Sequence, residues 1–292
     1  MALSTTNSTA LTDQQVIATL VTPLAAASVF LSSGVRIIDT AGPLRLPKLG
    51  APTAPAWFAQ NDLITPEVDP TFDEVALLPS TMKSVKTLTR FSNELARQSV
   101  IALDQALKDR LVTDVAATLD AQFFGLTGDG ILMPKGLFVY AGQTMAAVGV
   151  LTLDKLLDAE SLALGANVNT DSLKWVMRSR EFIALRKIKT AATGSNQYVL
   201  TPDPTTDGVF RLFGSPVIIT NRIPVVGTTT KTTQAVLADF SQIAVARDQA
   251  PTVKILDQTF GDYDQQAIRV TARYDAAPLN VESIVKLTGI TV

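Results

Sequence analysis

Residues 91–125 read FSNELARQSVIALDQALKDRLVTDVAATLDAQFFG and have the spacing of one long helix. Large apolar side chains recur at every fourth residue, namely Leu103, Leu107, Leu111, Val115, Leu119 and Phe123. Asp104 with Lys108, and Arg110 with Asp114, are pairs of opposite charge four residues apart, which are typical of the exposed side of a helix. The glycines that follow Phe124 predict its end.

This predicted helix is longer than the core of a compact enzyme usually needs. We expect it to begin after an N-cap at Ser92 or Asn93, with Glu94 in its first turn. About 32 residues at ~1.5 Å each predict a rod of roughly 48 Å. Because a step of four residues differs from the 3.6-residue period, the apolar row winds around the rod, and different elements must cover its two ends. A core helix of a large bundle is the simpler alternative.

The composition narrows the classes of function. The chain has 292 residues, is 47% hydrophobic and 18% charged, and carries a formal net charge of −2, so it lacks the basic excess typical of nucleic-acid-binding proteins. It contains no Cys and no His. Disulfides, thiolate nucleophiles, Ser-His-Asp triads and most transition-metal sites are therefore excluded or strongly disfavoured. We expect a protein that is not an enzyme and needs no cofactor or metal.

One apolar segment, residues 16–31 (VIATLVTPLAAASVFL), could be mistaken for a signal or membrane span. It has no basic residue before it, it is shorter than the roughly 20 apolar residues of a spanning helix, and Pro23 interrupts it. Its apolar residues have helical spacing instead, which predicts an amphipathic helix packed on protein. Residues 1–14 are small and polar, as in an arm, and we expect neither a membrane span nor a targeting signal.

Proline is dense between residues 41 and 79, where it rules out a helix and favours an edge strand or an isolated hairpin. The segments LRLPKL, AWFA and FDEVALL within this region still have β-type apolar residues. We therefore expect a two-stranded arm that projects from the body. Because such a hairpin is marginal alone, Trp57 and Phe58 need a partner surface from elsewhere, or else they cap their own hairpin.

The remaining segments mix helix and strand. We predict helices at 151–164 and 175–188, strands at 35–40, 213–224 and 235–240, and a loop at 225–234. Residues 253–277 have the alternation of a β-hairpin with Gly261, Asp262 and Asp264 at its turn, and 282–292 form a closing strand.

Three candidate sites do not have the pattern that their chemistry requires. GLTGDG at 125–130 lacks the Lys and Ser or Thr of a phosphate-binding loop and ends a helix instead of starting one. Asp257, Asp262 and Asp264 do not have the spacing of a calcium loop, so a solvated turn is the better interpretation. A carboxylate cluster lies in the proline-rich arm, where an acid and a base are poorly held in place. Its members are Glu67, Asp69, Asp73 and Glu74.

The order of these segments resembles the major capsid proteins of tailed bacteriophages with the HK97-type fold. The matching motifs, each weak alone, extend over about residues 15–290: Leu77–Pro79, Val85-Lys86, Phe91–Leu95, Leu119-Asp120, Phe123-Phe124, Pro134–Gly136, Trp175–Met177, Phe213–Val217, Ala238–Ser241 and Ile268–Val270.

The resemblance implies an α+β fold with four parts. Residues 1–35 are the N-terminal arm and amphipathic helix, and 36–78 are an extended loop that lies over a neighbouring subunit. Residues 79–135 and 239–277 are a peripheral domain with a long spine helix, and 136–238 and 278–292 are an axial domain. It also implies subunit contacts through two sets of residues: Lys48, Trp57 and Phe58 in the loop, with Asp262 and Tyr263 at the later hairpin.

The implied function is that of a virion shell, assembled in the host cytoplasm from pentamers and hexamers around double-stranded DNA that is contacted non-specifically. Portal, scaffolding and cementing or decoration proteins are the implied partners. Because Met1 lies close to the arm, a separate scaffolding protein or none is implied. Some relatives join subunits by a Lys–Asn isopeptide bond promoted by Glu; Lys48 matches the lysine, but Asp264 and Thr271 stand at the other positions. An encapsulin-like cargo shell is the alternative.

Overall fold

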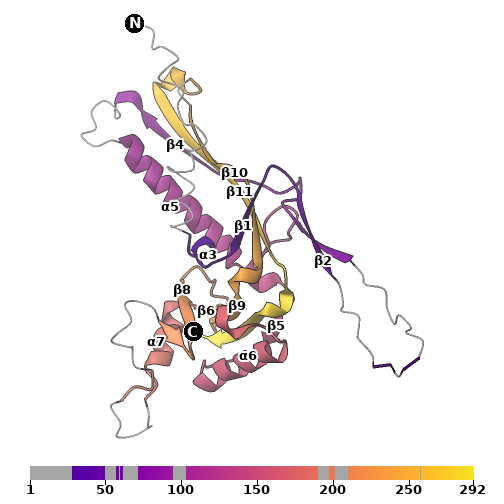
Figure 1. The fold of residues 1–292 in the computed structure, drawn as a ribbon. Helices are drawn as coiled ribbons and strands as arrows, with labels where there is room; N and C mark the ends of the chain where they lie inside the picture. The colour runs from indigo at the N-terminus through magenta and orange to yellow at the C-terminus, as the bar shows by residue number, and fades with distance from the viewer. Residues whose placement is uncertain are drawn as a thin grey trace.

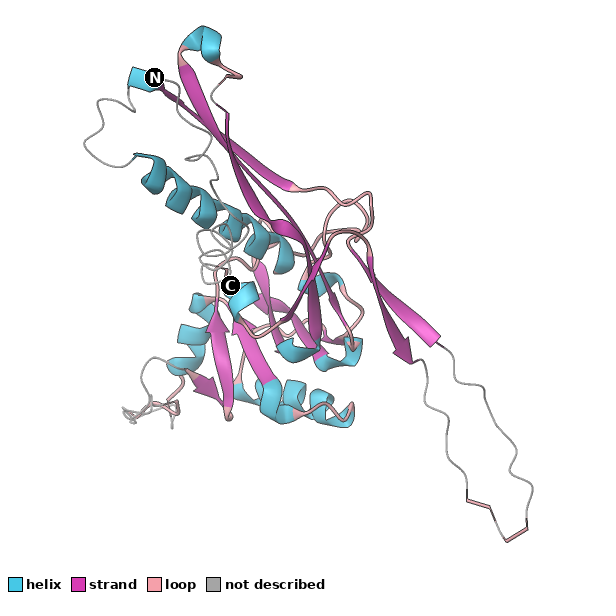
Figure 2. Cartoon of the chain, turned by 45° about the horizontal axis from the view of Figure 1, so that its top comes forward, coloured by secondary structure: helices cyan, strands magenta, loops and turns pink. Residues whose placement is uncertain are grey.

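The computed structural model describes residues 28–49, 57–58, 60–61, 72–94, 103–189, 197–200, 210–256 and 258–292. Its strands form a four-stranded sheet, a six-stranded sheet and a two-stranded hairpin (Figures 1 and 2). The polar arm and most of the helix predicted at 16–31 lie outside the described residues. No helix in the described ranges is long and apolar enough to cross a membrane.

The four-stranded sheet has the order β1-β10-β11-β4, in which β1 is parallel to β10 and the other pairs are antiparallel. Its strands are β1 (Arg36–Thr40), β4 (Val85–Ser92), β10 (Ile243–Leu256) and β11 (Gln265–Pro278). The long β10–β11 pair is the hairpin predicted at 253–277, and its connection contains the short 3₁₀ turn Gly261–Tyr263. The strand predicted at 35–40 is confirmed as β1.

Helix α5 (Leu103–Phe123) lies along one face of this sheet (Figures 1 and 2). The every-fourth-residue pattern is confirmed at Leu111, Val115, Leu119 and Phe123, all of which are buried. They share one core cluster with residues of both sheets, among them Val270 of the four-stranded sheet and Val236 of the six-stranded sheet.

A short helix, α3 (Val29–Ser32), is attached to α5 by the buried carboxylate of Asp120. Asp120 accepts hydrogen bonds from the Ser28 hydroxyl at 2.6 Å and from the backbone N–H groups of Val29 at 2.9 Å and Phe30 at 3.1 Å. A side chain of the long helix therefore caps the short one, and this cap joins residue 28 to the core.

The six-stranded sheet has the order β5-β12-β9-β6-β8-β7, with helices α6 and α7 beside it (Figure 1). Its strands are β5 (Gln143–Met145), β6 (Leu173–Met177), β7 (Arg211–Leu212), β8 (Ser215–Ile219), β9 (Thr232–Asp239) and β12 (Ile284–Thr291). The helices are α6 (Leu153–Gly165) and α7 (Ser179–Arg186). The closing strand predicted at the C-terminus is confirmed as β12, which pairs with β9 and β5.

The third sheet is the hairpin of β2 (Leu44–Leu49) and β3 (Phe72–Leu77), which extends away from the other two sheets (Figures 1 and 2). The prediction of a two-stranded projecting arm is therefore confirmed. Pro47 lies opposite Glu74, in a sheet that has only these two strands, so its missing N–H interrupts no larger ladder.

Two predicted boundaries are wrong, and each is corrected by strand pairing. The predicted start of the long helix is confirmed: β4 pairs with β11 along Val85–Ser92 and ends at Ser92, and Asn93 and Glu94 are helical, as an N-cap at Ser92 predicts. Beyond these two residues, the described helical part of 91–125 is α5, with 21 residues and a length of about 32 Å; residues 95–102 lie outside the described ranges.

The helix predicted at 175–188 is wrong at its start, because Trp175–Met177 lies in β6, between β9 and β8. A short apolar run buried on both faces has no periodicity that separates strand from helix. The second correction concerns the loop predicted at 225–234: its last residues, Thr232–Gln234, begin β9, where β-branched threonines suit a strand.

Candidate subunit interface

The β2–β3 hairpin and the loop between its strands carry apolar side chains that their own chain leaves uncovered. Trp57 is fully exposed and Phe58 is 41% exposed. Lys48, near the end of β2, is exposed as well. An aromatic side chain of this size is normally buried, so its full exposure marks a surface suited to a partner.

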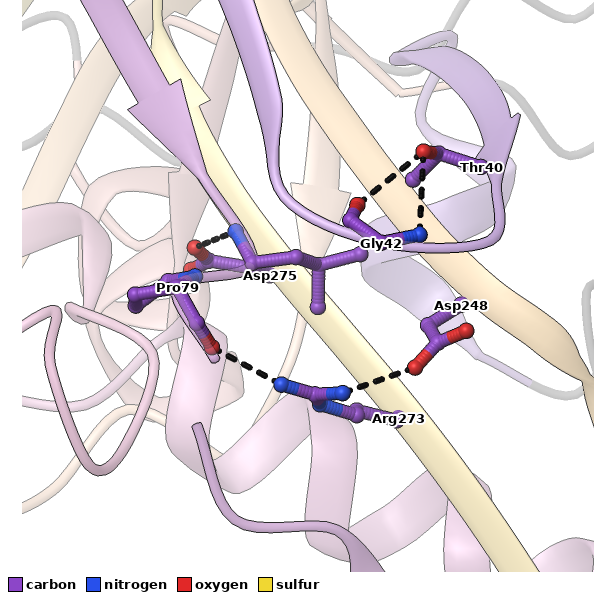
Figure 3. Close-up of polar contacts among 7 residues, drawn as sticks. Thr40, Gly42, Pro79, Asp248, Arg273 and Asp275 are labelled. Carbon is purple, nitrogen blue, oxygen red and sulfur yellow. Dashed lines mark hydrogen bonds and ion pairs between the residues drawn. The ribbon is translucent and has the colours of Figure 1, made fainter. Parts of the chain in front are cut away.

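The base of this hairpin is attached to the body by a buried carboxylate. Asp275 of β11 accepts a hydrogen bond from the backbone N–H of Leu78 at 2.8 Å (Figure 3). It also accepts one from the backbone N–H of its neighbour Ala276 at 2.9 Å. Leu78 is only 1% exposed and has a φ of +52°, a backbone conformation that a leucine rarely adopts. The N–H of this strained residue thus has a charged acceptor.

A second charged residue of β11 contacts Pro79, the residue that follows Leu78. Arg273 donates a hydrogen bond of 2.8 Å to the carbonyl of Pro79 and forms an ion pair of 2.9 Å with Asp248 of β10 (Figure 3). Arg273 and Asp275 together clamp residues 78–79, and we call these four residues the hairpin clamp. The clamp fixes the direction in which the hairpin leaves the body.

The clamp lies beside a small apolar cluster that covers the face of the four-stranded sheet opposite α5. Its buried members are Leu77, Leu78, Met82, Ala244, Ala246 and Ala277. Because the alanines of this cluster on β10 and β11 have small side chains, Leu77 and Leu78 can pack close to the sheet. Burial of these leucines stabilises the base by about 1.5–3 kcal/mol per side chain.

An open pocket of about 500 Å³ lies next to the clamp, lined in part by Asp129, Lys135, Tyr140 and Asp275. Three backbone N–H groups, those of residues 131–133, lower the pKa of Asp129 to about 2. Burial raises the pKa of Tyr140, whose hydroxyl donates to the carbonyl of Ala276. Burial likewise raises the pKa of Asp275 to about 6. These groups are held by backbone partners, which is an arrangement that supports a loop and not a nucleophile–base pair.

The far end of the β10–β11 hairpin forms a second exposed region. Asp262 and Tyr263 lie in its 3₁₀ turn, and Tyr263 is 76% exposed. Asp264 has a φ of +49° and accepts a hydrogen bond of 2.6 Å from the side-chain amide of Asn93, which attaches the turn to the end of β4.

The predicted contact residues thus form two groups that lie on different hairpins. Lys48, Trp57 and Phe58 belong to the hairpin of β2 and β3, whereas Asp262 and Tyr263 belong to that of β10 and β11. Thr271 lies in β11 opposite Lys86, a neighbour without a carboxylate. Asp257, Glu67 and Asp69 lie outside the described residues. Within the described ranges, no three acidic side chains gather as a metal site would require.

Sequence reasoning missed the hairpin clamp. The sequence signal for it was the pair of charged residues Arg273 and Asp275. They lie two residues apart, on the same face of the strand predicted at this point, and close to its buried C-terminal end. The contact with Leu78 joins positions 197 residues apart, so no local pattern indicates it.

Comparisons with known proteins agree with this architecture. The model of the phage capsid family matches residues 9–289. The capsid of a native GTA particle, computed with C5 symmetry, is similar with a TM-score of 0.72 and 17% identity, covering 89% of each chain. A chain from Mycobacterium phage Cain has a TM-score of 0.67 and 18% identity over 98% of this chain and 96% of its own. A chain from Microbacterium phage Oxtober96 has a TM-score of 0.70 and 15% identity, over 89% of this chain and 90% of its own.

No curated protein matches the sequence. The structural neighbours are less than 25% identical, so they establish the fold, which is the HK97-type capsid fold. The family match extends over most of the chain and therefore establishes family membership. It does not favour an encapsulin-like cargo shell. The chain belongs to the phage capsid family.

Proposed function

We propose that this chain is the major capsid protein of a tailed phage and assembles, as pentamers and hexamers, into the icosahedral shell around double-stranded DNA. The observation that carries the proposal is the projecting hairpin, which leaves the body at a fixed direction and presents Trp57 without cover from its own chain. Such a hairpin becomes useful when a neighbouring copy covers it, because a two-stranded unit is marginal alone.

In this proposal each part of the chain has its own contacts. The peripheral domain, residues 79–135 and 239–277, contains α5 and the long β10–β11 pair; the axial domain, residues 136–238 and 278–292, contains the six-stranded sheet. The loop within 36–78 contacts a neighbouring copy through Lys48, Trp57 and Phe58. Asp262 and Tyr263 contact another at the far end of the β10–β11 hairpin. The proposal assigns the chain no catalytic role.

Other partners follow from the same proposal. Packaged DNA is contacted non-specifically, and portal, scaffolding and decoration proteins are further candidates during assembly in the host cytoplasm. A formal net charge of −2 supports weak and non-specific contact with DNA, because tight binding requires a basic surface.

Assembly of the purified full-length chain tests this function. We expect closed particles of uniform diameter by electron microscopy, with five- and six-fold capsomers, either alone or after co-expression with the phage's own scaffolding protein. A chain that stays monomeric by light scattering under all these conditions would overturn the proposal. DNA recovered from particles purified from infected cells distinguishes a phage head from a cargo shell.

A further inference from the structure

The outer half of the four-stranded sheet has one apolar face and one basic face. In β11, Ile268, Val270 and Ala272 belong to the core cluster with α5, so the alternate residues Arg269 and Thr271 lie on the opposite face. The same alternation applies to β4 and β10. Four exposed cations on that face form what we call the basic face: Lys86, Arg90, Lys254 and Arg269.

Strand register brings these charges together. Arg269 lies directly opposite Lys254 on one side and opposite Leu88 on the other. Like charges directly opposite each other destabilise a sheet. None of the four cations forms an ion pair with a residue in the described ranges. The guanidinium of Arg90 lies over the ring of Phe260, at 3.9 Å from its centroid. The sheet thus carries an uncompensated repulsion that an anionic partner would relieve.

The chain itself contains an anionic segment of suitable composition. Residues 50–71, between the two strands of the hairpin, include three carboxylates and no Lys or Arg. The carboxylates are Asp62, Glu67 and Asp69. The two strands that flank this segment in the sequence, β2 and β3, extend away from the rest of their own chain (Figures 1 and 2), so we take an adjacent copy as the source of a counter-charge.

We propose that the basic face of one copy binds the acidic loop segment 50–71 of a second copy. The inference rests on the proposed function and adds to it the receiving surface and the chemistry of the contact. Charge complementarity of this kind sets register and partner choice between subunits.

Leu88 favours a peptide over nucleic acid as the occupant. This side chain is 44% exposed in the middle of the basic face, between Lys86 and Arg90 along β4. A phosphate backbone offers nothing to an apolar side chain, whereas the acidic segment also contains Leu63, Ile64 and Val68. A segment that combines apolar and acidic residues matches a face that contains both a leucine and four cations.

Charge reversal on both sides tests the proposal. Lys254→Glu with Arg269→Glu should lower the assembled fraction, measured by gradient sedimentation and microscopy, by more than about tenfold, because like charges then meet at the contact. Glu67→Lys with Asp69→Lys should do the same. The variant with all four changes should recover assembly to within about threefold of wild type, since the attraction is restored in reverse.

Controls separate this contact from other causes. Lys187→Glu with Lys189→Glu makes the same change of charge at exposed positions away from the basic face, and it should assemble at least about tenfold better than Lys254→Glu with Arg269→Glu. Wild-type assembly by Lys254→Glu with Arg269→Glu would overturn the inference. Failure of the variant with all four substitutions to recover assembly would overturn it as well. So would normal particles that hold less DNA, which would make the face a DNA contact.

Folding is checked by circular dichroism. If Lys254→Glu with Arg269→Glu unfolds the chain, Lys254→Gln with Arg269→Gln is tested in its place, because it removes both the attraction to the acidic segment and the repulsion between the two cations. Normal assembly of this neutral variant and of Glu67→Lys with Asp69→Lys would overturn the inference. The wild-type chain serves as the reference for the proposed function, since its own failure to assemble counts against that function and not against the basic face.

Discussion

The carboxylate of Asp275 in β11 accepts a hydrogen bond of 2.8 Å from the backbone N–H of Leu78, the residue that follows the last strand of the projecting hairpin. One end of this bond is a buried charge, and the other is a residue with a φ of +52°. Burial disfavours the charged form of Asp275, and the backbone of Leu78 is strained. The surrounding fold holds both residues in place.

Replacing Asp275 with Asn should change how stability depends on pH. Burial raises the pKa of Asp275 from 3.8 to about 6, so the folded chain binds this proton more tightly than the unfolded chain. Stability from this group is therefore greatest below pH 3.8 and decreases as the pH rises through 6, by about 3 kcal/mol in all. Asn keeps an acceptor for Leu78 without the charge.

We thus expect Asp275→Asn to raise the free energy of unfolding at pH 8 by about 1–3 kcal/mol, with the gain disappearing towards pH 4. Thermal unfolding of both proteins across this range measures it. An equal difference between the two proteins at every pH would contradict the expected role of the charge.

Replacing Asp120 with Ala should weaken the attachment of α3 to α5. The change leaves the Ser28 hydroxyl and two backbone N–H groups without their acceptor in a buried place, which costs about 2–4 kcal/mol. Denaturant unfolding measures the loss. Asp114→Ala on the same helix is a matched control, since it breaks only an exposed pair with Arg110 and should cost less than about 0.5 kcal/mol. Similar losses for both variants would argue against the cap.

Replacing Trp57 and Phe58 with Ala should prevent shell assembly and leave the subunit folded. Both side chains are exposed within their own chain, so helical circular dichroism and the melting temperature should stay close to wild type. In a shell each aromatic buries ~150–250 Å² against a neighbour, which makes it a strong anchor. Loss of folding in the unassembled double variant would instead assign these residues to their own subunit's core.

Mature particles should contain no covalent multimers. We expect Lys48 to stand where some relatives have the cross-linking lysine, but Thr271 has no carboxylate to shuttle a proton, and its partners across the strands are Thr252 and Lys86. Boiled particles should therefore run as one band near 31.1 kDa on a denaturing gel. A ladder of multimers would show that isopeptide bonds form by another arrangement.

Local patterns predicted much of this fold. The apolar period of α5 at Leu111, Val115 and Leu119, the proline-rich hairpin, and the alternation of β11 are each visible within a few residues of sequence, because helices and strands have fixed side-chain periods. The absence of His and Cys, together with the order of the motifs, indicates the capsid family from the amino-acid sequence by itself.

Tertiary structure alone decided the rest. Phe91 and Trp175 lie in strands because β11, β9 and β8 supply partners that a local pattern does not contain. The hairpin clamp and the basic face likewise depend on register between segments nearly 200 residues apart, as between Leu78 and Asp275 or Leu88 and Arg269. Propensity is a property of neighbouring residues, whereas strand pairing and buried charge contacts are decided by residues that only folding brings together.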